Sequence, residues 1–243
     1  LIGGSGIDIG AFERARAGAP SPAALRAQLG LGGDAEIVLT VSRLTRQKGI
    51  PTLLQAARIV CEARPQARFL LVGPRESEGP FAVGRDELER HAPYVVAPGA
   101  RNDVPALLEL ADVFAFPTEY REGIPRVLLE AGLAGLPIVT TGMPGCNDVV
   151  THLWNGYLVP PRDPGALAAR ILDLLRDRAG ARVMGGRSTE RVRREFDLNS
   201  VVGRYDALYR QVLARSRPDG ALVAPLPGAD ARGAIRRQDG GAS

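Results

Sequence analysis

Two glutamates with a fixed separation, Glu122 and Glu130, are the residues of this sequence whose chemistry is easiest to interpret. They bracket the predicted start of a helix, which follows an apolar run at 113–116 that is typical of a buried strand. At ~1.5 Å of rise per residue, the two carboxylates would lie roughly 12 Å apart along the helix axis. Carboxylates accept hydrogen bonds from paired hydroxyl groups, so both positions suit a ligand that carries diols.

The residues between the two glutamates predict an anion site. Pro125 suits the first helical turn, where its missing N–H costs nothing. The backbone N–H groups of Gly123, Ile124 and Arg126 would then face whatever lies above the end of the strand, and such a helix start favours phosphate. A ligand with phosphate in its middle and diols at both ends fits this arrangement, and a nucleotide sugar has that form.

A simpler interpretation of the same glutamates stays open. Glutamate at both ends of an amphipathic helix is common. Glu122 can be a charge at the helix start that the helix dipole favours, and Glu130 can be a solvated surface charge. The spacing alone does not decide between the two interpretations.

A second, basic motif follows another predicted strand, Ile37–Val41. The strand runs into a short loop that carries Arg43 and Lys48 and ends at Gly49, before the next predicted helix. Lys48 is the only lysine of the chain; every other basic residue is arginine. Arginine clamps a phosphate with two N–H groups and lysine adds a compact charge, although a solvated basic turn is the simpler alternative.

Strands and helices alternate along most of the chain, which predicts an α/β fold with an open, doubly wound, Rossmann-like parallel sheet. In such sheets ligands bind beyond the carboxyl ends of the strands, where both motifs fall. The predicted strands are Ile37–Val41, Phe69–Val72, Tyr94–Val96, Val113–Phe116, Pro137–Thr141 and Gly156–Val159. The predicted helices are Pro22–Leu29, Gly49–Ala63, Asp86–His91, Val104–Ala111, the helix after Glu122, Gly165–Arg176, Ala181–Glu195 and Asn199–Ala214.

Three regions are expected along the 243 residues. Residues 1–15 begin with a glycine-rich stretch and are predicted to be an interdomain linker, and residues 16–215 form the ligand-binding domain with its C-terminal helices. Residues 216–243 lack periodicity and are predicted to be a disordered tail. Its arginines suit anionic lipid headgroups, so a peripheral contact with the inner face of a membrane is an alternative to a tail without a role.

Composition excludes several classes of function. The net charge is +4, but the charges are mixed and no basic block indicates a nucleic-acid partner. The two cysteines, Cys61 and Cys146, belong to no spaced Cys/His set, so no metal site is expected. Two thiols without a disulfide framework fit a reducing compartment, and no apolar run is long enough to span a membrane, so a cytoplasmic location is expected.

In combination and in order, the motifs resemble the sugar-donor half of family-4 retaining glycosyltransferases of the GT-B architecture. The resemblance covers residues 1 to about 215. It rests on GSGID at 4–8, VSRLTRQKGI at 41–50, LLVGP at 70–74, the segment 111–141 with its Glu-x7-Glu motif, GCNDVV at 145–150 and NGYLVPPRDPGALAARI at 155–171.

The resemblance implies a role for each matching residue. Arg43 and Lys48 would neutralise the donor diphosphate, in place of a metal ion. Glu122 would bind hydroxyls of the transferred sugar, and Glu130 would bind the ribose. The remaining contacts would come from the backbone N–H groups of Gly123 and Ile124 beside Pro125, and from Val96 and Arg101 near the base.

The resemblance also implies the rest of the enzyme. The substrates would be a nucleotide sugar, UDP-linked in the bacterial polysaccharide enzymes that this sequence is most similar to, and a glycan or lipid-linked acceptor. A second, N-terminal domain of the same enzyme would complete the active site, and no cofactor is implied. The pair Asn147–Asp148 departs from the family pattern of a charged residue followed by glutamate, which leaves the role of Asp148 open.

Two other hypotheses for the function remain open. The chain can be a non-catalytic module that binds nucleotide sugars, or a GT-B-like sugar nucleotide epimerase. An epimerase needs acid–base residues, yet His91 and His152, the only histidines, fall at loop or helix-end positions. A dehydrogenase is disfavoured because no Gly-x-Gly-x-x-Gly follows the strand Ile37–Val41.

Overall fold

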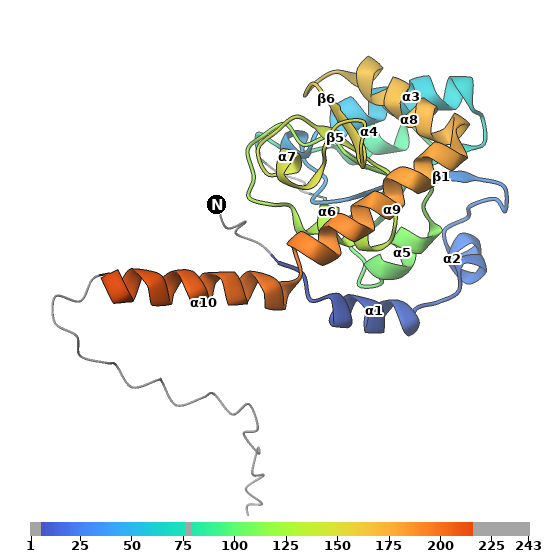
Figure 1. The fold of residues 1–243 in the computed structure, drawn as a ribbon. Helices are drawn as coiled ribbons and strands as arrows, with labels where there is room; N and C mark the ends of the chain where they lie inside the picture. Colours follow the sequence, from blue (N-terminus) through green and yellow to red (C-terminus); the bar gives the residue numbers. More distant parts are fainter. Residues whose placement is uncertain (1–5, 76–78, 216–243) are drawn as a thin grey trace, which may run out of the picture. The chain divides into compact units, whose positions relative to one another are not determined.

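The computed structural model describes residues 6–75 and 79–215 (Figure 1). The chain divides into two units, Leu1–Tyr205 and Asp206–Ser243. The first unit is built on a parallel sheet of six strands in the order β3-β2-β1-β4-β5-β6. The strands are β1 (Glu36–Val41), β2 (Ala67–Val72), β3 (Val95–Gly99), β4 (Val113–Phe116), β5 (Ile138–Thr141) and β6 (Gly156–Val159).

Helices and a 3-10 turn precede, connect and follow the strands. They are α1 (Ile9–Ala17), α2 (Pro22–Gln28), η1 (Arg46–Lys48), α3 (Ile50–Ala63), α4 (Arg85–Glu89), α5 (Val104–Leu110), α6 (Arg126–Leu133), α7 (Cys146–Val149), α8 (Pro164–Arg176), α9 (Arg178–Glu195) and α10 (Leu198–Arg215). The strand order reverses between β1 and β4, as in a doubly wound sheet, so the predicted fold class is confirmed.

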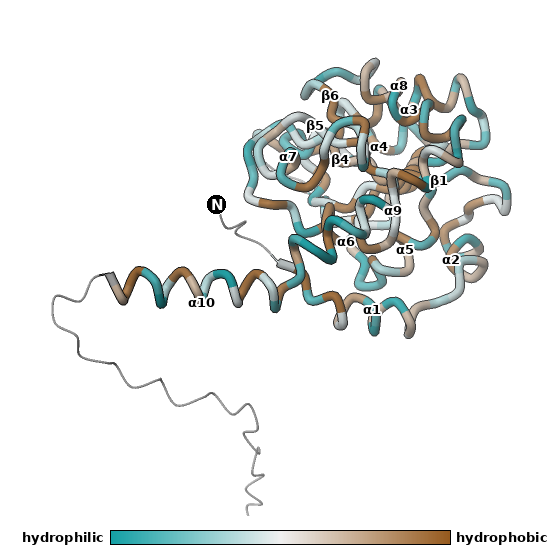
Figure 2. The backbone as a smooth tube through the Cα atoms, in the orientation of Figure 1, coloured by the Kyte–Doolittle hydropathy of each residue, from teal (hydrophilic) through white to brown (hydrophobic). Residues whose placement is uncertain are grey.

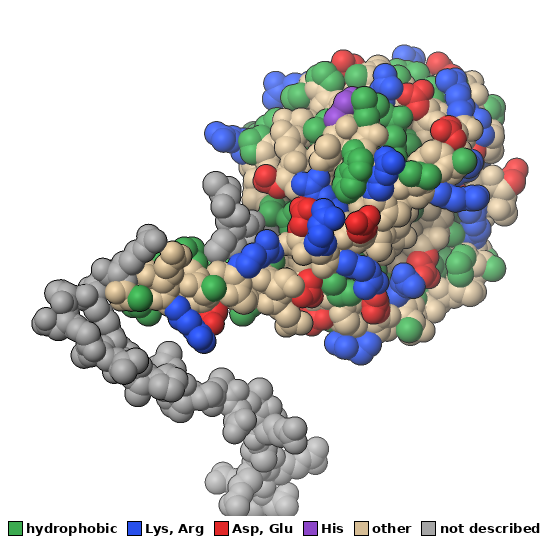
Figure 3. Space-filling model, viewed as in Figure 1, with side chains coloured by type: hydrophobic (Ala, Val, Ile, Leu, Met, Phe, Trp, Pro, Cys, Tyr) green, Lys and Arg blue, Asp and Glu red, His purple; other side chains and the backbone are tan. Residues whose placement is uncertain are grey.

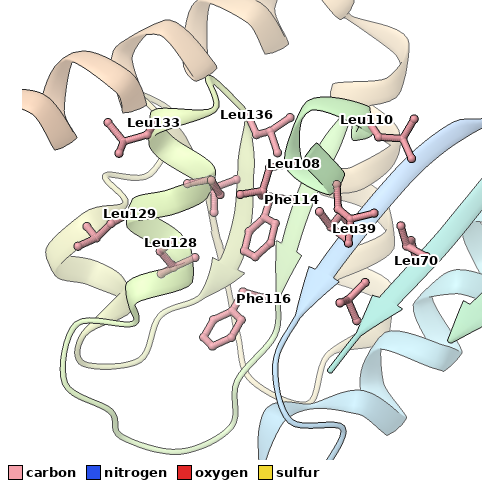
Figure 4. Close-up of a cluster of buried hydrophobic side chains, with 14 of the residues drawn as sticks. Leu39, Leu70, Leu108, Leu110, Phe114, Phe116, Leu128, Leu129, Leu133 and Leu136 are labelled. Carbon is pink, nitrogen blue, oxygen red and sulfur yellow. The ribbon is translucent and has the colours of Figure 1, made fainter. Parts of the chain in front are cut away.

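The strands β1, β2, β4 and β5 are buried on both faces, which explains why they are continuous apolar runs. On β1, Ile37 and Leu39 enter one hydrophobic cluster with residues of α5 and α6, while Val38 enters a second cluster with residues of α3 and α8. Figure 4 shows the first cluster, with Phe114 between the sheet and the leucines of α6. Helices on both faces fix the sheet and leave its carboxyl edge to the loops.

The N-terminal segment contains a helix that the sequence did not predict. Residues Ile9–Ala17 form α1, whose first turn is capped by the carboxylate of Asp8 accepting from the N–H of Ala11 at 2.7 Å. Phe12 is buried in the first cluster, and Ile7 pairs with Asp197. The glycine-rich start of the segment is typical of a linker, but the apolar residues Ile7 and Phe12 pack on the domain. An interdomain role for residues 1–15 stays a prediction.

Two short elements, η1 and α7, were not expected, because four or fewer residues show no periodicity. The predicted first-turn position of Pro125 is wrong by one residue. Pro125 is the N-cap of α6, with φ −67° and ψ 117°, and the helix begins at Arg126. The other predicted strands and helices are present, with ends shifted by a few residues.

Helix α10 is amphipathic, and Figure 2 shows apolar and polar residues alternating along it. Its apolar side chains include Val202, Tyr209 and Leu213, which are 57%, 64% and 64% exposed. No helix in the described part of the chain is long and apolar enough to cross a membrane. The predicted tail, 216–243, lies outside the described residues, as do its arginines.

Candidate functional site

The two predicted motifs meet where the strand order reverses. Strands β1 and β4 are neighbours, with Val38 opposite Val113 and Leu39 opposite Phe114. Their chains leave the carboxyl edge of the sheet through the loops 42–49 and 117–125. A topological switch point of this kind is the usual ligand site of an open α/β sheet. The parallel topology therefore brings together residues that are about seventy positions apart in sequence.

Lys48 and Glu122 form the centre of the site. The Lys48 Nζ donates to Glu122 Oε2 at 2.7 Å, and the two side chains are only 10% and 15% exposed. The ammonium also lies 4.9 Å from the ring centre of Tyr120 and 5.3 Å from that of Phe116. Because partial burial weakens screening, this pair is held more firmly than a surface ion pair. The buried ion pair therefore favours the ligand-binding interpretation of both motifs over a solvated basic turn.

Hydrogen bonds between the two loops fix this pair. Thr118 Oγ1 donates to the second oxygen of Glu122 at 2.7 Å, and the backbone N–H of Glu119 donates to the carbonyl of Gln47 at 2.8 Å. Gly49 has φ +71°, and a Cβ there would lie 1.9 Å from the carbonyl oxygen of Pro117. Only glycine allows the two loops to approach this closely.

The segment before α6 leaves backbone donors available. Gly123 is exposed and Ile124 is half-buried, and their N–H groups have no hydrogen-bond partner among the described residues. Gly145, with φ +88°, lies directly behind them, since a Cβ there would lie 2.2 Å from the carbonyl oxygen of Gly123. Pro125 is buried. Two adjacent unpaired N–H groups at the start of a helix can bind an anion.

Glu130 lies in the middle of α6 with 20% of its side chain exposed. Burial raises the pKa of its carboxyl above the ordinary value, and the neighbouring Arg126 guanidinium partly opposes this shift. Arg126 Nε donates to Glu130 Oε1 at 3.0 Å. A half-buried carboxylate is not the solvated surface charge of the simpler interpretation.

The remaining predicted residues lie around this centre. Arg43 is exposed, two residues beyond β1. Val96 and Arg101 belong to β3 and the loop after it, two strands away from β1, which is about 10 Å across a sheet. Arg101 binds Asp103, with Nε donating to Oδ1 at 2.8 Å, and it also contacts Gln28. The structure therefore does not bring Val96 and Arg101 together with Lys48 and Glu122.

A hollow of 410 Å³ opens beside the ends of β2 and β3. Gly73, Arg75 and the run Ala97–Gly99 are among its lining residues, whereas Val96 and Arg101 are not. Within residues 6–75 and 79–215, no group of His, Cys, Asp and Glu side chains has the geometry to hold a metal ion. Sequence reasoning missed Thr118 and Tyr120, because nothing local indicates that they contact the charged pair.

Comparisons with known proteins identify the family of this chain. The sequence profile of the family described as Glycosyl transferases group 1 matches residues 35–177, more than half of the chain, so the chain belongs to that family. Figure 3 shows basic and acidic side chains interspersed over the face of the molecule that it draws.

Two curated relatives and one solved structure define the likeness further. The chain is 29% identical, over 73% of its length and 45% of the relative's, to the N,N'-diacetylbacillosaminyl-diphospho-undecaprenol alpha-1,3-N-acetylgalactosaminyltransferase of Campylobacter jejuni. It is 31% identical, over 89% of its length and 55% of the relative's, to a GDP-mannose-dependent phosphatidylinositol monomannoside mannosyltransferase of Mycobacterium tuberculosis. The crystal structure of Anabaena HepE with UDP and glucose superposes with a TM-score of 0.70 at 25% identity, covering 86% of this chain and 55% of HepE. The chain thus spans about half the length of these relatives.

Proposed function

We propose that this chain is the sugar-donor-binding half of a retaining glycosyltransferase. The enzyme would transfer a sugar from a UDP-linked nucleotide sugar to a glycan or lipid-linked acceptor in polysaccharide synthesis. The observation that carries the proposal is the Lys48–Glu122 pair at the switch point, beside the unpaired N–H groups of Gly123 and Ile124. Family membership supports the same reaction class.

The chemistry of transfer requires charge compensation on one side of the breaking bond. As the nucleoside diphosphate leaves, negative charge grows on its phosphate oxygens, and fixed cations stabilise that charge. An ammonium has three donors, so Lys48 can keep Glu122 and still bind a phosphate oxygen. Arg43, at the end of the same strand, supplies a second cation. With both cations in place, the reaction needs no metal ion.

The two glutamates would recognise the ends of the sugar donor. Glu122 has one oxygen on Lys48 and the other on Thr118, which orients its remaining lone pairs toward sugar hydroxyls. Glu130 would accept the ribose hydroxyls from α6. The base would lie in the hollow lined by Arg75 and the run Ala97–Gly99, near the predicted Val96 and Arg101.

The acceptor and the other domain are proposed from the relatives. The Campylobacter jejuni relative is named for a diphospho-undecaprenol substrate, which supports a lipid-linked acceptor. An N-terminal domain of the same enzyme would supply the acceptor contacts, and the exposed apolar stripe of α10 offers it a surface. Location in the cytoplasm, at the inner face of the membrane, would follow from such an acceptor.

Calorimetric titration of this chain with UDP, GDP and ADP, without and then with magnesium, tests the proposal. The expected result is saturable binding of UDP that does not depend on magnesium. Preference for GDP would change the proposed base from uracil to guanine and keep the assignment of a donor-binding domain. The mannosyltransferase relative is named for a GDP-linked sugar. Absence of binding to all three nucleotides would overturn the assignment of the site.

A further inference from the structure

A second hollow, of 570 Å³, opens on the other side of the Lys48 loop, where α3 and α8 cover the sheet. We call it the Phe81 pocket. Its lining includes Arg46, Gln47, Gln55, Phe81, Glu119 and Arg162. It shares one wall with the candidate site, because Tyr120 also faces the Lys48 ammonium. The proposed transfer reaction assigns no role to this pocket.

Part of the lining of the Phe81 pocket is aromatic and apolar. Phe81 is 44% exposed, which is unusual for a phenylalanine that is held in place. Its carbonyl accepts from the N–H of Arg46 at 2.9 Å, and Thr45 forms a bridge with Ala82. The backbone of Phe81 is therefore fixed against the Lys48 loop, and its side chain is partly exposed there. Prolines and Tyr120 complete the apolar lining.

The polar rim of the pocket is preorganised around Glu119. This carboxylate accepts from Thr52 Oγ1 at 2.9 Å and from Arg162 Nε at 2.7 Å, and its side chain is 13% exposed. Arg162 has φ +59°, a conformation that residues other than glycine rarely adopt. Such backbone strain persists only where the surrounding contacts hold it, and it is enriched at ligand sites.

The charges at the pocket indicate what kind of ligand it takes. Arg46 pairs with Glu87 at 3.0 Å and Arg162 pairs with Glu119, so the two cations and two carboxylates balance. An anionic ligand would therefore find no net attraction. The side-chain amides of Gln47 and Gln55 have no hydrogen-bond partner within the described chain, so both remain available to hydroxyl groups.

We propose that the Phe81 pocket binds an uncharged pyranose unit of a glycan, outside the nucleotide site. The apolar face of the sugar ring would lie on Phe81 and Tyr120, and its hydroxyls would bond to Gln47, Gln55 and Glu119. This inference rests on the proposed function, since a glycan substrate gives the pocket its ligand.

The test is nuclear magnetic resonance titration of the 243-residue chain with methyl α-D-glucopyranoside, methyl β-D-galactopyranoside and N-acetylglucosamine. At least one sugar should saturate shifts of the Phe81 and Tyr120 resonances, and Phe81→Ala should weaken that affinity about tenfold or more. Leu153→Ala is the matched control, because Leu153 is an exposed apolar residue elsewhere that should leave the affinity unchanged. No saturable shift with any of the three sugars, or equal affinity in Phe81→Ala, would overturn the proposal.

Two further titrations separate this proposal from the proposed function. Phe81→Ala should bind UDP as the unsubstituted chain does. Loss of sugar binding in this variant, with UDP binding intact, would therefore test the pocket and not the nucleotide site. Sugar shifts without any UDP binding would instead support the pocket and reject the nucleotide site. Glucose 6-phosphate should bind no tighter than the methyl glucoside, and tighter binding would contradict the charge balance of the pocket.

Discussion

Glu130 is the carboxylate whose surroundings say most about its role. A buried position raises its pKa, so folding favours the neutral form over the ionised one. A group whose pKa is raised on folding stabilises the folded state at pH values below its unfolded pKa. This stabilisation is lost as the pH rises through the folded pKa. At neutral pH the ionised Glu130 therefore costs stability, which the protein tolerates if the carboxylate binds ribose.

Glu130→Gln should separate these two effects. UDP affinity should fall roughly 10- to 100-fold, because a charge-assisted acceptor becomes a neutral amide. The melting temperature at neutral pH should rise slightly, because the ionised group is gone. Calorimetry and thermal unfolding measure the two quantities, and Glu62→Gln, at a carboxylate that is 68% exposed, serves as the control.

The pH dependence of UDP binding checks the same assignment. As pH falls toward the raised pKa of Glu130, the carboxylate is lost and affinity should drop, at a higher pH than for a solvated glutamate. Glu130→Gln should lack this dependence. Equal pH profiles for the two proteins, or unchanged UDP affinity in the variant, would remove Glu130 from the nucleotide site.

Residue types predicted the centre of the site better than its surroundings. Lys48 and Glu122 stood out because of spacing and rarity, and strand topology placed both at one edge of the sheet. Their contacts with Thr118 and Tyr120 depend on how two distant loops pack, which no local pattern contains. The ion pair between Arg101 and Asp103 was likewise not predicted, because a loop has no periodicity that shows which side chains pair.

At the scale of elements, Gly49 joins the two loops of the site. Gly49→Ala would place a methyl group against the Pro117 carbonyl and hold alanine at a positive φ. The free energy of unfolding should fall by more than about 2 kcal/mol, and UDP affinity should fall because the loops separate. Urea denaturation and calorimetry measure both effects.

Gly33→Ala is the matched control, because a Cβ at Gly33 meets no atom within 4 Å. Its free energy of unfolding should change by no more than about 0.5 kcal/mol. If Gly49→Ala behaved like Gly33→Ala, the close approach of the two loops would not be required for the site.

Elements with strong local patterns were predictable and short ones were not. The buried runs of β1, β2, β4 and β5 identify themselves, because a strand covered on both faces is apolar throughout. The helix α1 was missed because its glycine-rich start resembles a linker, and its anchor, Phe12, becomes meaningful only once the first cluster exists. The boundary at Pro125 shifted by one residue, which is ordinary for helix ends.

At the scale of the whole molecule, binding of the sugar donor and transfer of the sugar can be studied separately. The chain spans about half the length of its relatives, but the residues assigned to the nucleotide all lie within its described part. Nucleotide binding can therefore be measured on this chain, whereas transfer depends on groups that the proposal places in another domain. Cys61 and Cys146 are both free thiols, so no disulfide complicates such measurements.

The most direct test of the central claim is the UDP affinity of Lys48→Ala beside that of the unsubstituted chain, measured by calorimetry without metal. Loss of the ammonium removes a charge-assisted contact worth about 1.5–3 kcal/mol, so affinity should fall roughly 10- to 150-fold. Arg58→Ala, which removes an exposed cation from α3, should leave it unchanged. Equal affinity in Lys48→Ala and the unsubstituted chain would contradict the claim that the Lys48–Glu122 pair forms the nucleotide-sugar site.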